Sequence, residues 1–182
     1  MKYLKQFLLF FSLISLLVSC QEDRDPLNSI PFVTLGADQT GISFSNQLTY
    51  STGLNIIEYL YYYNGGGVAV GDINNDGLED LYFSANQLPD RLYLNNGIGN
   101  FTKSNQTLPS GKPESTSTVS SCDFDQDGDM DLFVGVRLRA NLIGIPQNGY
   151  LLENDGNGEF KNVTEQIAPE LMGAGMITGA SW

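Results

Sequence analysis

Two acidic loops of the same pattern hold the residues best suited to chemistry in this 182-residue chain. The first runs from Asp72 to Asp80 and reads DINNDGLED, and the second runs from Asp123 to Asp131 and reads DFDQDGDMD. Oxygen-bearing side chains at alternate positions, a glycine at the turn and a carboxylate three residues later are what a hard cation such as Ca²⁺ needs to be wrapped by one short segment. Both loops therefore indicate metal binding rather than catalysis.

Other known calcium loops do not fit this pattern. An EF-hand needs flanking helices and a bidentate Glu at the twelfth position, where this chain has Phe83 and Val134. The remaining alternative is an Asx-rich turn that binds no metal. Two full matches within one chain favour metal binding over that alternative.

Strand signals flank both loops and recur with them. Short apolar runs bounded by turns lie at residues 68–70, 81–83, 92–94 and 101–102, and again at 132–134, 150–152 and 160–163. The turn NGIGNF of residues 96–101 also recurs, as DGNGEF at 155–160. Four short antiparallel strands per repeat of about 50–60 residues are typical of a β-propeller blade. The sequence predicts an all-β fold of about two complete β-propeller blades and the first strand of a third, which is an incomplete propeller.

The repeats, together with the N-terminal targeting segment described next, divide the chain into six predicted segments. They are a lipoprotein signal peptide (1–19), a flexible acidic tether (20–29), a β-rich leader (30–64), a first blade (65–116), a second blade (117–175) and the start of a third blade (176–182). In the leader, Ile42 and Phe44 alternate with serines, which is a strand signal. The tyrosine-rich run 59–63 predicts either a strand packed on the first blade or a platform on which sugars stack.

The first twenty residues resemble a bacterial lipoprotein signal. Lys2 and Lys5 precede an apolar run at residues 7–18 that is too short to span a bilayer comfortably. The run ends in LVSC, which resembles the lipobox, where the signal is cut before a cysteine that becomes lipid-modified. The alternative is an ordinary signal peptide or an N-terminal membrane anchor. The resemblance implies a lipid on Cys20 and anchoring at the bacterial outer membrane. The acidic stretch at residues 21–25 resembles a surface-export signal of such lipoproteins, which implies exposure at the cell surface.

Composition excludes several functions. The chain has 9 basic and 21 acidic residues, a formal net charge of −12 and no histidine. Without clustered Lys and Arg it is not expected to bind nucleic acid. Without histidine it cannot form a His-based triad or an HExxH zinc site. If Cys20 carries lipid, Cys122 has no disulfide partner, and we expect a small buried apolar residue there rather than a reactive thiol.

The two loops with their flanking strands resemble the FG-GAP/VCBS family of calcium-binding propeller repeats, which also occur in integrin α-subunits. The resemblance rests on GGGVAVGDINNDGLEDLYF and SSCDFDQDGDMDLFV and extends over about residues 42–182. It implies two Ca²⁺ sites. The implied ligands are Asp72, Asn74, Asp76, Asp80 and the Leu78 carbonyl in the first loop, and Asp123, Asp125, Asp127, Asp131 and the Asp129 carbonyl in the second.

The two sites are expected to differ in affinity. Four carboxylates converge in the second loop and three in the first, so repulsion in the absence of metal is larger in the second loop. Tighter Ca²⁺ binding is therefore expected there. In both loops the Kd should be on the order of 10⁻⁴ to 10⁻³ M, as in extracellular modules.

The resemblance implies a non-enzymatic, calcium-binding surface lipoprotein. Its propeller would serve binding, adhesion or glycan uptake, with an unidentified protein or glycan as partner and structural Ca²⁺ ions. The alternative is the N-terminal part of a propeller enzyme, such as a polysaccharide lyase or hydrolase, whose catalytic residues lie beyond Trp182. Bacterial proteins of this kind often carry an ASPIC/UnbV-type domain after the propeller, so the downstream sequence would separate the two classes.

Overall fold

The computed structural model of the chain describes residues 32–53, 55–108, 114–139 and 145–182. The predicted signal peptide (1–19), Cys20 and the acidic tether (20–29) lie outside the described residues. Contacts divide the chain into one unit of residues 1–34 and another of residues 35–182, and all the described strands belong to the second. In the described part, none of the helices has the length and apolar character that crossing a membrane requires.

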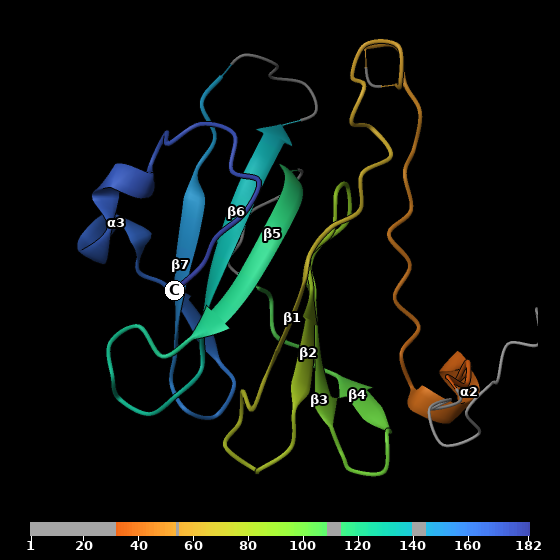
Figure 1. Cartoon of the computed structure of the whole chain (residues 1–182), viewed down its shortest axis with the longest axis vertical. Helices are drawn as coiled ribbons and strands as arrows, with labels where there is room; N and C mark the ends of the chain where they lie inside the picture. The colour runs from red at the N-terminus through yellow and green to blue at the C-terminus, as the bar shows by residue number, and fades with distance from the viewer. Residues whose placement is uncertain (1–31, 54, 109–113, 140–144) are drawn as a thin grey trace, which may run out of the picture. The chain divides into compact units, whose positions relative to one another are not determined.

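The described strands form two antiparallel sheets of four, in the orders β1-β2-β3-β4 and β5-β6-β7-β8 (Figure 1). The first sheet consists of β1 (Val68–Gly71), β2 (Asp80–Phe83), β3 (Arg91–Asn95) and β4 (Phe101–Lys103). The second consists of β5 (Glu114–Cys122), β6 (Asp131–Arg139), β7 (Gly149–Asn154) and β8 (Phe160–Asn162). Three short helical segments accompany them: α2 (Ala37–Thr40), α3 (Thr164–Ile167) and a 3₁₀ helix at Pro169–Leu171.

The two sheets repeat the same register. Leu81 of β2 faces Tyr93 of β3, and at the corresponding place Leu132 of β6 faces Leu152 of β7. Such apolar cross-strand pairs stabilise neighbouring strands and fix their register. The all-β prediction is confirmed, with one four-stranded sheet for each predicted repeat, and the described residues form no closed propeller.

The hydrophobic core draws on both sheets. Strand β1 contacts β5, and the Ser121 hydroxyl of β5 donates a hydrogen bond of 2.8 Å to the Val70 carbonyl of β1. The buried cluster consists of Ala69, Ile73, Tyr82, Leu92, Val119, Leu132, Val134, Val136, Tyr150 and Leu152. Because one continuous apolar cluster joins the sheets, each repeat buries its face against the other.

The described part of the predicted β-rich leader (30–64) is not built of β-strands, which corrects that prediction. Residues 41–48 do alternate between exposed and half-buried positions, as the sequence indicated, but they pair with no strand. They pack instead on the first sheet, where the ring of Phe44 stacks on Phe83 with centroids 5.1 Å apart. Residues 55–63 form turns. Alternating burial indicates an extended chain, whereas the hydrogen bonds of a β-sheet also require a free edge strand beside that chain.

One predicted segment boundary differs from the observed elements, and another stays untested. Strand β5 begins at Glu114, inside the stretch that was assigned to the first blade (65–116). Residues 176–182 contain no strand, although the Ile177 N–H donates a hydrogen bond of 3.1 Å to the Val136 carbonyl of β6. A third blade beginning at residue 176 therefore stays a prediction.

Candidate metal sites

Each acidic loop connects the first two strands of its sheet. The loop of residues 72–80 joins β1 to β2, and the loop of residues 123–131 joins β5 to β6. Both turn through the left-handed region twice, at Asn75 and Gly77 in the first loop (φ 58° and 85°) and at Gln126 and Gly128 in the second (φ 65° and 100°). Glycine enters this region without steric cost, which explains the glycine in both motifs.

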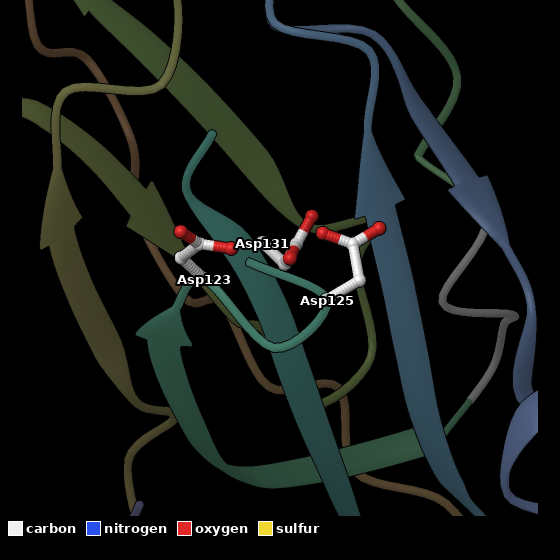
Figure 2. A group of neighbouring side chains, drawn as sticks. All are labelled: Asp123, Asp125 and Asp131. Carbon is white, nitrogen blue, oxygen red and sulfur yellow. The ribbon is translucent and has the colours of Figure 1, made fainter. Parts of the chain in front are cut away.

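Three predicted ligands of the second loop converge. Asp123, Asp125 and Asp131 each offer a carboxylate oxygen, and these three oxygens lie within 4.8 Å of one another. Figure 2 shows the three carboxylates gathered at the loop between β5 and β6. Oxygens bound to one Ca²⁺ at about 2.4 Å cannot lie more than about 4.8 Å apart, so this spacing suits a single ion. The group of three carboxylates could hold a metal ion.

The last aspartate of each loop is held by two backbone N–H groups. Asp131 accepts hydrogen bonds from Phe124 N (3.1 Å) and Asn154 N (2.8 Å). Asp80 likewise accepts from Ile73 N (3.0 Å) and Asn95 N (2.7 Å). Each bond pair ties the loop to the third strand of its sheet, so these carboxylates are fixed in position.

Two further hydrogen bonds match between the two loops. Asp123 accepts from Gly128 N (3.1 Å), as Asp72 does from Gly77 N (2.8 Å). Asp127 accepts from Asp129 N (3.0 Å), as Asp76 does from Leu78 N (2.9 Å). The two loops therefore share one backbone frame.

Burial makes ionisation of the last aspartate costly. Asp131 is 1% exposed, and burial raises its pKa to about 6, with smaller contributions in the same direction from Asp125 and Asp127. Burial likewise raises the pKa of Asp80, to which Asp76 and Asp72 also contribute. Neighbouring carboxylates disfavour the charged form, and a bound cation favours it. The electrostatics of both loops therefore fit a positive ion.

Cys122 lies beside the second loop as a half-buried free thiol. Burial raises its pKa to about 11, and the Asp131 and Asp123 carboxylates act in the same direction. A thiol with so high a pKa is protonated at neutral pH and reacts poorly. This agrees with the expected packing role.

The first loop closes on itself through hydrogen bonds. Asp72 accepts a further bond from Asp76 N (3.0 Å), and the amide nitrogen of Asn74 donates to a carboxylate oxygen of Asp76 (3.1 Å). Among the described residues, no trio of carboxylates in this loop meets the spacing found in the second. The first loop has the neutral amide of Asn74 at the position where the second loop has the carboxylate of Asp125. The first loop therefore concentrates less negative charge.

The side chain of Asp129 is directed toward the other repeat. One of its carboxylate oxygens accepts a hydrogen bond of 2.5 Å from the amide of Asn75 in the first loop, and that amide also donates to the Gly156 carbonyl (3.3 Å). The two acidic loops are thus joined directly. The proposed ligand roles of the Leu78 and Asp129 carbonyls stay predictions.

Sequence reasoning missed Asn154, which links the two sheets. It is 3% exposed, and its amide donates to the carbonyls of Ile73 (2.7 Å) and Met130 (3.1 Å) while its oxygen accepts from Gly158 N (3.1 Å). Its backbone N–H holds Asp131. A signal was present, because Asn95 and Asn154 both directly precede the repeated glycine-containing turn.

The chain thus contains, twice in succession, a pair of adjoining strands joined by an aspartate-rich loop. Residues 72–134 match the FG-GAP-like repeat family. The FG-GAP-like repeat begins at the first aspartate of the first loop and ends within β6, so it contains both acidic loops. The resemblance seen in the sequence is confirmed over these residues. No curated protein and no solved structure matches the chain significantly.

The residues of the FG-GAP-like repeat fit a hard cation. All the side-chain atoms predicted to bind metal in the two loops are carboxylate or amide oxygens, which are the ligand atoms that Ca²⁺ prefers. The second loop already gathers three of them within the reach of one ion.

Proposed function

We propose that this chain is the calcium-binding, bladed part of a bacterial surface lipoprotein, and that its Ca²⁺ ions are structural. The observation that carries the proposal is the convergence of Asp123, Asp125 and Asp131 within the FG-GAP-like repeat. The repeat indicates a propeller-like binding module, because blades of this kind present connecting loops on a rigid scaffold.

A structural role for the ion follows from where the carboxylates lie. The second loop connects two paired strands, and Asp131 bonds to Phe124 at the start of the loop and to Asn154 at the end of β7. A cation that cancels the repulsion at Asp131 would stabilise these bonds and hold three strands in register. Such a site stiffens the blade and leaves the exposed loops available for a partner.

The partner and the location are part of the proposal. The net charge of −12 disfavours nucleic acid and leaves a protein or a glycan at the cell surface as partner. The LVSC sequence supports lipid attachment at Cys20 and anchoring at the outer membrane.

Calorimetry on the metal-stripped chain tests the calcium part. We expect Ca²⁺ binding at two sites with Kd on the order of 10⁻⁴ to 10⁻³ M. An Asp125→Asn variant should bind Ca²⁺ about tenfold more weakly at the tighter site, since one carboxylate ligand in the group is lost. Asp38→Asn is the matched control, because Asp38 is an exposed aspartate in α2, outside both loops. Absence of binding heat, or equal losses in the two variants, would refute the calcium role.

Expression in a bacterial host tests the lipid anchor. The wild-type chain should incorporate a labelled fatty acid and sediment with the outer membrane, and a Cys20→Ser variant should do neither. A wild-type chain that is released without label would show that the LVSC sequence is part of an ordinary signal peptide.

A further inference from the structure

A cavity of about 520 Å³ lies on the first sheet, where β3 begins and β4 ends. It is lined by residues 89–92 and 103–108, all of which the structure describes. Its volume is within the range of about 300–1,000 Å³ that small-molecule sites occupy. None of the described lining residues belongs to an acidic loop, so the cavity is separate from the candidate metal sites.

Hydrogen bonds fix the wall of the cavity that follows β4. The Ser104 N–H donates to the Leu92 carbonyl (2.9 Å), and the Ser104 hydroxyl accepts from Gln106 N (3.2 Å). The Gln106 side chain reaches the second sheet, where its amide nitrogen donates to the Gly158 carbonyl and its oxygen accepts from Phe160 N (3.2 Å). The wall is therefore in place before a ligand binds, which lowers the entropic cost of binding.

The cavity gathers positive charge on an acidic chain. Five of the nine basic residues of the sequence belong to the described part, and two of these five, Arg91 and Lys103, line the cavity. The Nη1 group of Arg91 donates to the carbonyls of Pro89 (3.1 Å) and Asp90 (2.9 Å). Because both carbonyls are neutral, these bonds position the guanidinium without cancelling its charge.

The one acidic residue in the described lining already has partners inside the protein. Asp90 is 3% exposed, and its carboxylate accepts hydrogen bonds from the Tyr82 hydroxyl (2.9 Å) and from Ala85 N (2.8 Å). Two cations and one carboxylate leave a formal charge of +1 at the cavity, on a chain whose net charge is −12. A local field of this sign attracts a single anionic group.

The second sheet forms a cavity at the same place without these cations. In the register that the two sheets share, Asn162 of β8 occupies the place of Lys103. By the same register, Tyr150 of β7 occupies the place of Arg91. Both Asn162 and Tyr150 line a cavity of about 290 Å³, and the one charged residue in its described lining is Glu165. The fold therefore forms this hollow without positive charge, so the two cations of the first cavity are not required by the fold.

The rest of the lining combines polar and apolar groups. Ser104, Asn105 and Thr107 bring hydroxyl and amide side chains, which suit the hydroxyl groups of a sugar. Leu92 is 1% exposed and Leu108 packs against the core, so both supply an apolar surface for the C–H groups of a sugar ring.

We propose that this cavity binds a uronic-acid residue of an acidic glycan. Arg91 and Lys103 would hold the sugar carboxylate through charge-assisted hydrogen bonds, and the polar side chains after β4 would bond to the sugar hydroxyls. One carboxylate matches the formal charge of the cavity. The inference rests on the proposed function in taking a glycan as the partner, and it names the chemical class of that glycan.

Calorimetric titration of the calcium-loaded full chain tests the ligand class. Sodium glucuronate should bind the wild type with a Kd of about 1 mM. Glucose lacks the carboxylate and acetate lacks the hydroxyl groups, so at equal ionic strength each should bind at least tenfold more weakly. Acetate or phosphate that binds as tightly as glucuronate would overturn the proposal, because the cavity would then recognise charge alone.

Variants of Lys103 test the site itself. Lys103→Met should weaken glucuronate binding about tenfold, whereas Lys103→Arg keeps the charge and should stay within about threefold of the wild type. Lys161→Met is the matched control, because Lys161 is an exposed lysine of β8 outside the described lining of the cavity. Arg91→Met should abolish binding. Equal weakening in Lys103→Met and Lys161→Met would overturn the proposal, since it would reflect only the net charge of the chain.

Methyl glucuronide distinguishes a glycan from a free sugar acid. Its C1 is blocked as in a polysaccharide, and it should bind at least as tightly as free glucuronate. A wild type that binds glucuronate and rejects methyl glucuronide would overturn the assignment to a glycan.

Titration of the same wild-type sample with Ca²⁺ separates this inference from the calcium proposal. Ca²⁺ binding without any glucuronate binding would overturn the assignment of the cavity and leave the calcium role standing. Glucuronate binding without Ca²⁺ binding would support the cavity and overturn the calcium role.

Discussion

The two acidic loops share the same pattern of backbone hydrogen bonds and differ in how their other residues pack against the rest of the protein. In both, the last aspartate accepts two backbone N–H groups, and the glycine N–H bonds to the first aspartate. In the first loop Ile73 is 2% exposed, within the core shared by the two sheets, and Asn75 bonds to the second repeat. At the place in the second loop that corresponds to Ile73, Phe124 is only half-buried.

The loops therefore depend on different forces. Packing against the second sheet and the amide of Asn74 hold the first loop in shape. The second loop has less packing and one more carboxylate, with the oxygens of Asp123, Asp125 and Asp131 facing one another. We infer that protein contacts stabilise the first loop and that a bound cation stabilises the second. Variants at matched positions of the two loops separate these two forces.

The largest effect is expected at the asparagine that links the sheets. Asn154→Leu removes three side-chain hydrogen bonds of a buried residue and should lower the free energy of unfolding by about 3–5 kcal/mol. Its counterpart Asn95 is half-buried and makes two side-chain hydrogen bonds, neither of them buried, so Asn95→Leu should cost about 1–2 kcal/mol. Urea denaturation measures both. Equal losses would show that the first loop is not anchored through the second sheet.

The next largest effect on stability is expected at the residue that follows the first aspartate of each loop. Ile73→Ala empties a buried site and should cost about 3 kcal/mol, whereas Phe124→Ala at the half-buried counterpart should cost less than half of that. Both variants are compared by urea denaturation in the presence of Ca²⁺. A larger loss of unfolding free energy in Phe124→Ala than in Ile73→Ala would show that packing stabilises the second loop more than the first.

Exchanging the donors at the third loop position should exchange the calcium affinities. Asn74→Asp adds a carboxylate and should tighten Ca²⁺ binding to the first loop several-fold, on the order of 1 kcal/mol, while adding repulsion in the metal-free state. Calorimetry on Asn74→Asp, Asp125→Asn and the double variant measures this. If Asn74→Asp leaves both Kd values unchanged, side-chain charge does not set the order of affinity.

A further effect is expected in the pH dependence of the metal-free chain. The pKa of Asp131 is about 6 in the folded protein and near 3.8 as an ordinary aspartate, so between these values the folded form binds more protons than the unfolded form. The contribution of Asp131 to stability therefore falls as pH rises from about 4 to 6. Comparing the unfolding free energies of wild type and Asp131→Asn over this range isolates it. Excess Ca²⁺ should cancel the fall, and a rise in its place would contradict the burial of an unpaired carboxylate.

The sequence predicted those features that local pattern determines. The apolar runs at 68–70 and 132–134 became strands, and the spacing of the aspartates located both loops, because extended conformation and loop shape are set by neighbouring residues. The same reasoning failed at residues 42–48, where alternation was correct but strand pairing depends on a distant edge. Asn154 was missed for the same reason, since it bonds to Ile73 only in the folded chain.

Hydrogen exchange with and without Ca²⁺ measures how far each loop depends on a bound cation. Ca²⁺ should slow exchange of the backbone N–H groups in residues 123–131 strongly and those in residues 72–80 less, and a chelator should reverse both changes. Exchange that does not respond to Ca²⁺ in either loop, or protection confined to the first loop, would show that a bound cation does not stabilise the second loop.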